Sequence, residues 1–171
     1  MKALFVSDSH GLTAELEILV EKHQDEVDLF IHCGDSELAP DHPALQNYVV
    51  VGGNCDFDDR FSEDIVKKIG NKTIFITHGH KYSIKSSLMK LAYKAREANA
   101  DIACFGHSHF LGAEMAQGIL FINPGSIRLP RGRKEKTYVI VEIVEAGYEL
   151  RVYDLNSGEI KELIQHFSLP F

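Results

Sequence analysis

The sequence predicts an α/β protein in which β-sheets are covered by helices on their outer faces. Two observations support this prediction. In the first half of the chain, short apolar runs typical of buried strands alternate with segments of helical periodicity. In the second half, such runs occur in pairs around turn residues, which is typical of β-hairpins. Sheets with helices outside them fit both patterns, because every element must bury its apolar face against another layer.

The first three predicted strands are short apolar runs without helical spacing, which indicates burial. They span residues 3–6, 29–33 and 48–51. Each run leads into a polar loop, and these loops contain Asp8, Asp35 and Asn54. Chain segments after parallel strands meet at one edge of an α/β protein, so we expect these three side chains to lie close together.

Two segments have the periodicity of a helix with one apolar face. The first follows Thr13 and the second follows Ser86 and Ser87, residues of a type that caps helix N-termini. The apolar positions are Leu16, Leu19 and Val20 in the first segment and Leu88, Leu91, Ala92 and Ala95 in the second. Both helices are expected on the outside of the sheets.

Three hairpins are predicted from turn residues between apolar runs. They cover residues 65–76 around Gly70-Asn71-Lys72, residues 114–122 around Gln117-Gly118, and residues 138–153 around Ala146-Gly147. Asn123 to Ser126 are expected to form a turn, and residues 160–164 a last strand.

Composition limits the class of protein. The 171 residues are 44% hydrophobic and 25% charged, which fits one globular domain over residues 1–171. A net charge of −7 gives no strong signal for nucleic-acid binding, which needs a basic face. The odd cysteine count of 3, without disulfide spacing, fits a reducing cytoplasm. The chain starts directly with a strand pattern and has no span apolar enough for a membrane, so we expect neither a signal peptide nor a membrane partner.

Histidine, aspartate and asparagine residues follow the predicted strands. The set consists of Asp8, His10, Asp35, Asn54, His78, His107 and His109. Side chains at positions i and i+2 of an extended segment point the same way, so His107 and His109 are expected to aim at one spot. One tetrahedral zinc site uses about four ligands, and a larger set suits two metals that share a carboxylate. The nitrogen and oxygen donors favour manganese, iron, zinc or cobalt over softer ions.

The order of these residues resembles the calcineurin-like metallophosphoesterase superfamily. The matching blocks are Asp8-Ser9-His10, Gly34-Asp35, Gly53-Asn54-Cys55-Asp56, His78-Gly79 and Gly106-His107-Ser108-His109. The resemblance covers the chain from about residue 8 to residue 126, and the small size looks like the single-domain phosphodiesterase branch of bacteria and archaea.

The resemblance implies a four-layer αββα sandwich of two mixed sheets flanked by helices. It assigns Asp8, His10 and His109 to a first metal and Asn54, His78 and His107 to a second, with Asp35 as the bridge. Asp35, Asn54 and His107 are thereby placed in the catalytic set. It implies hydrolysis of a small phosphoester by a hydroxide that bridges two divalent ions. We expect manganese first, with zinc, iron, cobalt or nickel as alternatives.

The sequence departs from the family pattern where many members have a histidine that protonates the leaving group. That place is taken by Cys55, and the acidic–arginine pair that often follows Gly-Asp is replaced by Ser36-Glu37-Leu38. General acid catalysis is typically worth about 10²–10⁴-fold. Diesters with good leaving groups are therefore the expected substrates.

Several interpretations stay open from the sequence. The motif favours His78 over His80 as the ligand, and His32 within a strand fits a hydrogen-bonded core residue better than a ligand. Asp56 could orient a ligand or cap a turn. The cluster from Arg131 to Lys136 could be a solvated loop or could steer anionic substrates.

Two alternative functions are considered beside the phosphodiesterase. One is a phosphomonoesterase acting on a small metabolite. The other is a non-catalytic scaffold similar to the retromer subunit of this fold, which lacks a complete ligand set, whereas all seven positions here carry ligand-type residues. Association into a homo-oligomer is left open.

Overall fold

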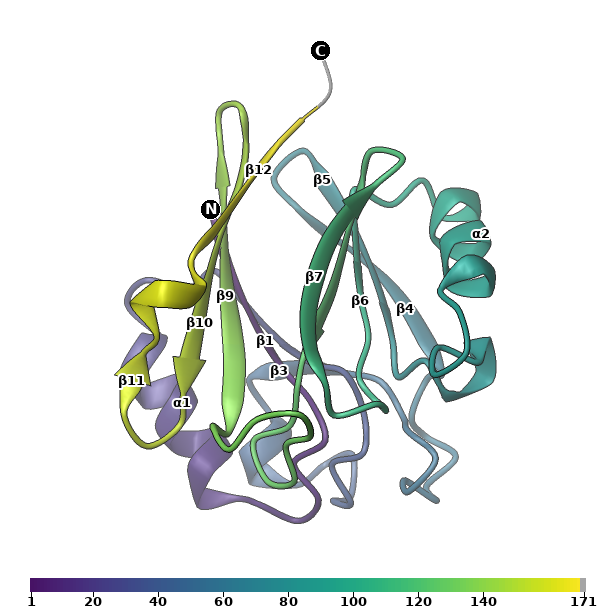
Figure 1. The fold of residues 1–171 in the computed structure, drawn as a ribbon. Helices are drawn as coiled ribbons and strands as arrows, with labels where there is room; N and C mark the ends of the chain where they lie inside the picture. The colour runs from purple at the N-terminus through teal and green to yellow at the C-terminus, as the bar shows by residue number, and fades with distance from the viewer. Residues whose placement is uncertain (170–171) are drawn as a thin grey trace.

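In the computed structural model, which describes residues 1–169, two β-sheets pack face to face and helices cover their outer faces (Figure 1). The first sheet has the order β11 (Gly158–Glu159), β10 (Gly147–Asp154), β9 (Thr137–Val144), β1 (Lys2–Val6), β2 (Leu29–His32) and β3 (Tyr48–Val50), and β12 (Gln165–Ser168) also pairs with β10. The second sheet has the order β4 (Asp64–Ile69), β5 (Lys72–Thr77), β6 (Ile102–Cys104), β8 (Ile119–Pro124) and β7 (Leu111–Ala116). Both sheets contain parallel and antiparallel pairs.

The helices form the two outer layers. Helix α1 (Ala14–His23) packs on the first sheet and α2 (Met89–Glu97) on the second. Short 3₁₀ turns occur at η1 (Pro43–Leu45), η2 (His80–Tyr82) and η3 (Lys161–Leu163). The expected four-layer αββα sandwich is confirmed. None of the helices in residues 1–169 has the length and apolar character needed to cross a membrane.

Strand β1 explains why the first apolar run lacks alternation. Ala3 and Phe5 lie in the core between the sheets, whereas Leu4 and Val6 belong to the cluster that contains the buried residues of α1. Successive side chains of a strand point to opposite faces, and here both faces are buried. A continuous apolar run is the consequence.

The three hairpins are confirmed, but two local predictions are wrong. Residues 160–164 do not form a strand: η3 lies there and β12 begins at Gln165. Ile160 and Leu163 pack against the same core, and a 3₁₀ turn brings positions i and i+3 to one side. Asn123 and Pro124 continue β8, so the turn begins at Gly125.

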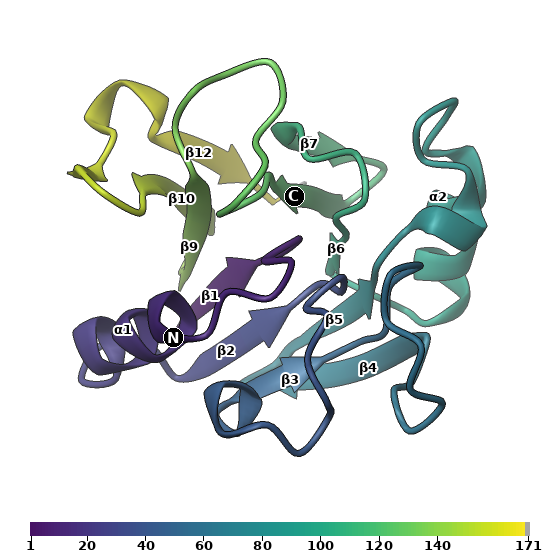
Figure 2. The same cartoon turned by 90° about the horizontal axis from the view of Figure 1, so that it is seen from below.

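The topology gathers the loops that carry the motifs. Strands β1, β2 and β3 are parallel to one another, as are β5 and β6, so the loops at their carboxyl ends leave each sheet on the same side. These loops lie at the lower end of the molecule in Figure 1 and face the viewer in Figure 2. The two sheets thus bring chain segments about 100 residues apart to one edge, as the contact between His10 and His109 shows (|i−j| = 99).

Candidate metal centre

The backbone of the motif loops has an uncommon conformation. Five of the seven candidate residues have a positive φ, namely Asp8, His10, Asp35, His107 and His109. This left-handed region is sparsely populated by residues other than glycine and often marks functional sites. The loops are therefore not extended, and the expectation that His107 and His109 aim at one spot because of strand alternation is wrong. The two side chains diverge toward neighbouring clusters.

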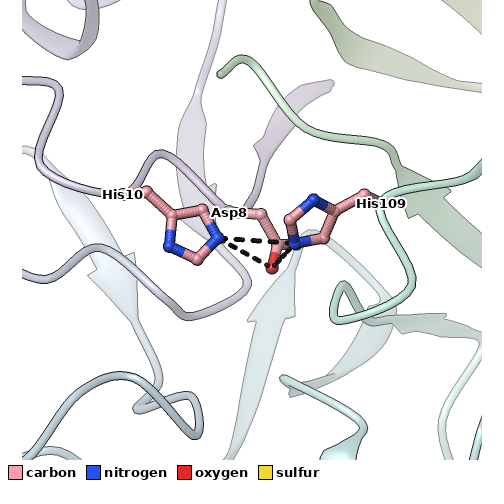
Figure 3. A group of neighbouring side chains, drawn as sticks. All are labelled: Asp8, His10 and His109. Atoms are coloured by element: carbon pink, nitrogen blue, oxygen red, sulfur yellow. Dashed lines mark hydrogen bonds and ion pairs between the residues drawn. The ribbon is translucent and has the colours of Figure 1, made fainter. Parts of the chain in front are cut away.

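The first cluster consists of Asp8, His10 and His109 (Figure 3). The two Nε2 atoms of the histidines lie 3.4 Å apart, and His109 Nε2 lies 3.1 Å from Asp8 Oδ1. Asp8 is fully buried, and its Oδ1 atom accepts no hydrogen bond among the described residues. Asp8 Oδ2, in contrast, accepts from Ser7 Oγ and from the backbone N–H of His107.

The partners of the Nδ1 atoms define the tautomers of this cluster. His10 Nδ1 lies 2.5 Å from Glu37 Oε1, and His109 Nδ1 lies 2.7 Å from the carbonyl oxygen of Leu129. A carbonyl oxygen and a carboxylate only accept, so both Nδ1 atoms carry the hydrogen. In the neutral rings the two Nε2 atoms then present lone pairs to each other and to Asp8 Oδ1. Such an arrangement of acceptors lacks a donor and fits a cation.

The second cluster has the same character. His78 Nδ1 donates to the carbonyl oxygen of Cys33 at 2.8 Å. Its Nε2 atom then faces Asp35 Oδ2 and Asn54 Oδ1, each at 3.2 Å. Asp8 Oδ1 lies 3.9 Å from the same nitrogen, so the two clusters adjoin. Fixing the ring by an Nδ1–H···O=C bond is the usual way in which proteins orient a metal-binding imidazole.

His107 and His80 lie beside this second cluster. The ring centroids of His107 and His80 are 5.2 and 5.3 Å from that of His78. His78 is fully buried and touches Asp35 and Asn54, whereas His80 is only half-buried and its Nδ1 atom has no hydrogen-bond partner among the described residues. The geometry thus separates the two histidines that the motif alone left ambiguous.

Protons compete with a cation for the same atoms. Burial alone would lower the pKa of His78, but Asp35 and Asp8 raise it above its ordinary value. The neighbouring carboxylate of Asp8 raises the pKa of His109, against burial and the charge of Arg131. Because metal ions bind the neutral imidazole, a lower pH favours the proton over the metal. The two His/Asp clusters fit a divalent metal site.

Asp56 joins the loop of Asp35 to the loop of Asn54. One oxygen accepts the backbone N–H groups of Asp35 and Gly53, each at 2.8 Å, and the other accepts that of Glu37 at 2.7 Å. A carboxylate that accepts several backbone N–H groups is a strong local fastener. Of the two readings that the sequence left open, the structure supports the one in which Asp56 orients a candidate ligand.

Two motif glycines are required by close approach. A Cβ on Gly53 would lie 2.0 Å from Asp35 Oδ1, and one on Gly106 would lie 2.0 Å from Ser7 Oγ and 2.5 Å from Asp8 Oδ2. Any side chain at these positions would displace a candidate ligand.

Cys55 lies at the site, as its place in the motif indicated. Its Sγ atom and one ligand atom each of His10 and Asp35 lie within 4.8 Å of one another. Burial, followed by the charge of Asp35, raises the pKa of the thiol to about 11. The thiol is therefore protonated near neutral pH, and a thiolate nucleophile is not expected. Cys33, Cys55 and Cys104 are all free.

Sequence reasoning missed the supporting residues. Glu37 holds His10, and Ser126 Oγ donates to the carbonyl oxygen of Asp8 at 2.7 Å, yet both contacts join loops that are distant in sequence. His32 was expected to be a hydrogen-bonded core residue, and it is: its ring contacts Ser9 Oγ and the backbone N–H of Gly34. Burial lowers the pKa of His32 to about 4, so the ring is neutral.

Comparisons with known proteins agree with this geometry. The model of the calcineurin-like phosphoesterase superfamily domain matches residues 1–146. The probable metallophosphoesterase YsnB of Bacillus subtilis is 47% identical over 169 residues, which cover 99% of this chain and 100% of YsnB. The probable metallophosphoesterase MJ0623 of Methanocaldococcus jannaschii is 31% identical over 131 residues, which cover 74% of this chain and 68% of the relative.

Solved structures share the fold. A predicted phosphoesterase from Streptococcus pneumoniae superposes with a TM-score of 0.94 at 37% identity, covering 98% of this chain and 97% of that chain. Vps29 of Entamoeba histolytica in complex with Zn²⁺ superposes with a TM-score of 0.74 at 23% identity, covering 99% and 98%, which shows likeness of fold alone. With its family model, its relatives and its His/Asp clusters in agreement, the chain belongs to the calcineurin-like phosphoesterase superfamily, in the small branch of bacterial and archaeal phosphoesterases.

Proposed function

We propose that this chain is a phosphodiesterase that works with two divalent metal ions, in a single domain spanning residues 1–171. The observation that carries the proposal is the pair of adjoining clusters in which only hydrogen-bond acceptors face one another. Buried acceptors without a donor are costly, and cations compensate them directly. The phosphodiesterase activity itself is tested by a screen of the purified protein, with added metal, against diesters and monoesters.

The proposed ligands divide between the two clusters. Asp8, His10 and His109 would hold the first ion, and Asn54, His78 and His107 the second. Asp35 would serve both ions, since its Oδ2 atom faces His78 and one of its oxygens lies in a group with His10. The mixed nitrogen and oxygen set favours manganese, with zinc, iron, cobalt or nickel as alternatives.

The chemistry follows from charge and position. Two divalent ions held by these clusters would activate water and neutralise phosphate oxygens. The protein residues would keep the ions in place: Glu37 and the carbonyl oxygen of Leu129 orient the rings of His10 and His109, and Asp56 fixes the loops of Asp35 and Asn54. The dianion of a phosphomonoester, the alternative substrate, would bind at the same positive centre.

The leaving group decides between diesters and monoesters. A thiol with a pKa of about 11 at Cys55 is a poor proton donor near neutral pH. Ester groups that depart without a proton, such as aryl oxides, are then favoured. A complete set of candidate ligands favours the enzyme over a purely structural scaffold.

The first prediction concerns this preference. With added Mn²⁺, the protein should hydrolyse bis(4-nitrophenyl) phosphate faster than an alkyl monoester such as glycerol phosphate, because no imidazole protonates the leaving oxygen. Cys55→His should narrow the difference, whereas Cys55→Ser should keep most of the diesterase activity. Steady-state rates on both substrates check this. Faster turnover of the alkyl monoester, or loss of activity in Cys55→Ser as complete as in a ligand variant, would contradict it.

The second prediction concerns Asp35. Asp35→Asn keeps the shape of the side chain but removes its charge and turns one acceptor into an NH₂ donor that would face a cation. We expect lower occupancy of both metals. We also expect activity to fall by more than the roughly 10- to 100-fold that is typical when a residue that only supports a metal ligand is replaced. Asn54→Ala should weaken mainly one metal and lose less activity. Metal analysis, turnover and circular dichroism measure these effects. Two bound metals with near-normal turnover in folded Asp35→Asn would show that Asp35 is not the shared ligand.

The third prediction concerns Asp56. In Asp56→Asn, an amide NH₂ would replace an oxygen that accepts buried N–H groups, which typically costs about 1–3 kcal/mol of stability. We also expect roughly 10- to 100-fold weaker metal binding, because the hydrogen bonds that join the loops of Asp35 and Asn54 are lost. Thermal unfolding and metal titration measure the two effects. Asp58→Asn is the matched control, since the carboxylate of this half-buried residue pairs only with Arg60 within residues 1–169, and it should change neither quantity. Equal effects of the two substitutions would contradict the role of Asp56.

A further inference from the structure

The loop from Ser126 to Arg133, called here the arginine loop, joins β8 to β9 beside the first cluster. It is the green segment that leads into β9 in Figure 2. It carries Arg128, Arg131 and Arg133, and the roles proposed so far for the centre use none of them. From the sequence, part of this segment was either a solvated loop or a device that steers anions.

The arginine loop is fastened to the first cluster at three points. Ser126 Oγ donates to the carbonyl oxygen of Asp8 at 2.7 Å, and it accepts the backbone N–H of Leu129 at 2.8 Å. His109 Nδ1 donates to the carbonyl oxygen of Leu129, and the backbone N–H of Arg131 donates to the carbonyl oxygen of His109 at 3.1 Å. A solvated loop would not be held by the candidate ligands themselves. Its side chains are therefore positioned relative to the centre.

Two of the arginines are free to bind an anion. The guanidinium of Arg128 donates from Nη1 to the carbonyl oxygen of His10, and the backbone of Arg131 is held against His109. Both side chains are exposed, and within residues 1–169 neither lies within 4.0 Å of a carboxylate. Arg133, in contrast, pairs with Glu135 at 3.0 Å. Guanidinium groups without a carboxylate partner, carried on a loop held beside the first cluster, are well suited to bind phosphate.

The side of the centre next to the second cluster is acidic. A cavity of about 380 Å³ next to Asn54 is lined by Asp58, Asp59 and Glu63 among others. Lys81 pairs with Glu63 and Arg60 with Asp58, but these two cations stand against four lining carboxylates, because Asp56 also lines the cavity. The remaining negative charge disfavours an additional anion there. A substrate with two phosphate groups would thus be oriented by this difference in charge, with the second phosphate on the side of the first cluster.

We propose that Arg128 and Arg131 bind a second phosphate group of the substrate, so that the preferred substrates are phosphodiesters that carry a further phosphate. This inference rests on the proposed phosphodiesterase function. A terminal phosphate carries a charge of about −1.5 to −2 near neutral pH, against one negative charge on the diester. Guanidinium groups on this held loop would therefore add selectivity that metal ions at the reacting phosphorus do not supply.

The test uses two substrates that share a leaving group. These are the 4-nitrophenyl ester of thymidine 5′-phosphate and the same ester with a 3′-phosphate. The Mn²⁺-loaded wild-type protein should favour the second by about tenfold in kcat/KM, the scale of one charge-assisted hydrogen-bonding contact. Arg131→Gln should remove most of this preference through KM and change the rate on the first substrate less than about twofold. Arg131→Lys should keep part of it, because it retains the charge without the planar fork.

Controls separate this effect from a general change in charge. Arg96→Gln removes an exposed arginine on α2 and should leave the preference intact. Raising the salt concentration should weaken the wild-type preference more than that of Arg131→Gln. Arg131→Gln should fold normally, since only the backbone N–H of Arg131 takes part in holding the loop.

A binding measurement keeps the inference separate from the proposed function. Calorimetry should show tighter binding of thymidine 3′,5′-bisphosphate than of thymidine 5′-phosphate to the metal-loaded protein, and Arg131→Gln should abolish the difference. If neither ester is hydrolysed but this difference is found, the phosphate site stands and the phosphodiesterase proposal fails. Equal binding of both nucleotides, or a preference that survives in Arg131→Gln, would overturn the inference.

Discussion

Mutual repulsion among closely spaced acceptors, most of them buried, is the constraint on which this structure depends. Few hydrogen-bond donors reach the small volume between the two clusters. Oxygen atoms of Asp8, Asp35 and Asn54 point into it, as do the Nε2 atoms of His10, His78 and His109. In a low-dielectric interior such an arrangement is unfavourable unless positive charge is present. The carboxylates raise the pKa of His78 and of His109, and divalent ions would supply positive charge directly.

The rest of the edge holds these atoms in place against that repulsion. Residues that are not candidate ligands do this work: Asp56 ties two loops together, and Ser126 ties the loop after β8 to Asp8. Left-handed backbone at Asp8 and Asp35 is retained because these contacts and the buried strands before them fix the chain on both sides. The two packed sheets act as the rigid support, and the loops at their carboxyl ends carry the chemistry.

Much of this architecture was predictable from the sequence. The run from Ala3 to Val6 was recognisable as a buried strand because both its faces are covered. The strands on either side of Ala146-Gly147 pair as a hairpin, as expected. The order of the motif residues pointed to the family and to the seven candidate positions. The contact of His10 with His109 could be anticipated only from that order, since no local pattern links residues separated by |i−j| = 99.

The remainder could not be predicted for physical reasons. The left-handed φ of His107 and His109 depends on tertiary contacts, so strand alternation gave the wrong directions for their side chains. Glu37 and Arg128 act on His10 across loops, through contacts that leave no periodic signal in the sequence. Residues 160–164 are apolar enough for a strand, but their packing at i and i+3 selects a 3₁₀ turn.

Anomalous diffraction at the manganese edge, from crystals grown with Mn²⁺, tests the two-metal centre most directly. We expect two anomalous peaks in each chain, one against Asp8, His10 and His109 and the other against Asn54, His78 and His107, with Asp35 in contact with both. A single peak, or peaks elsewhere on the surface while these side chains keep their present contacts, would contradict the claim that the acceptor clusters form a two-metal centre.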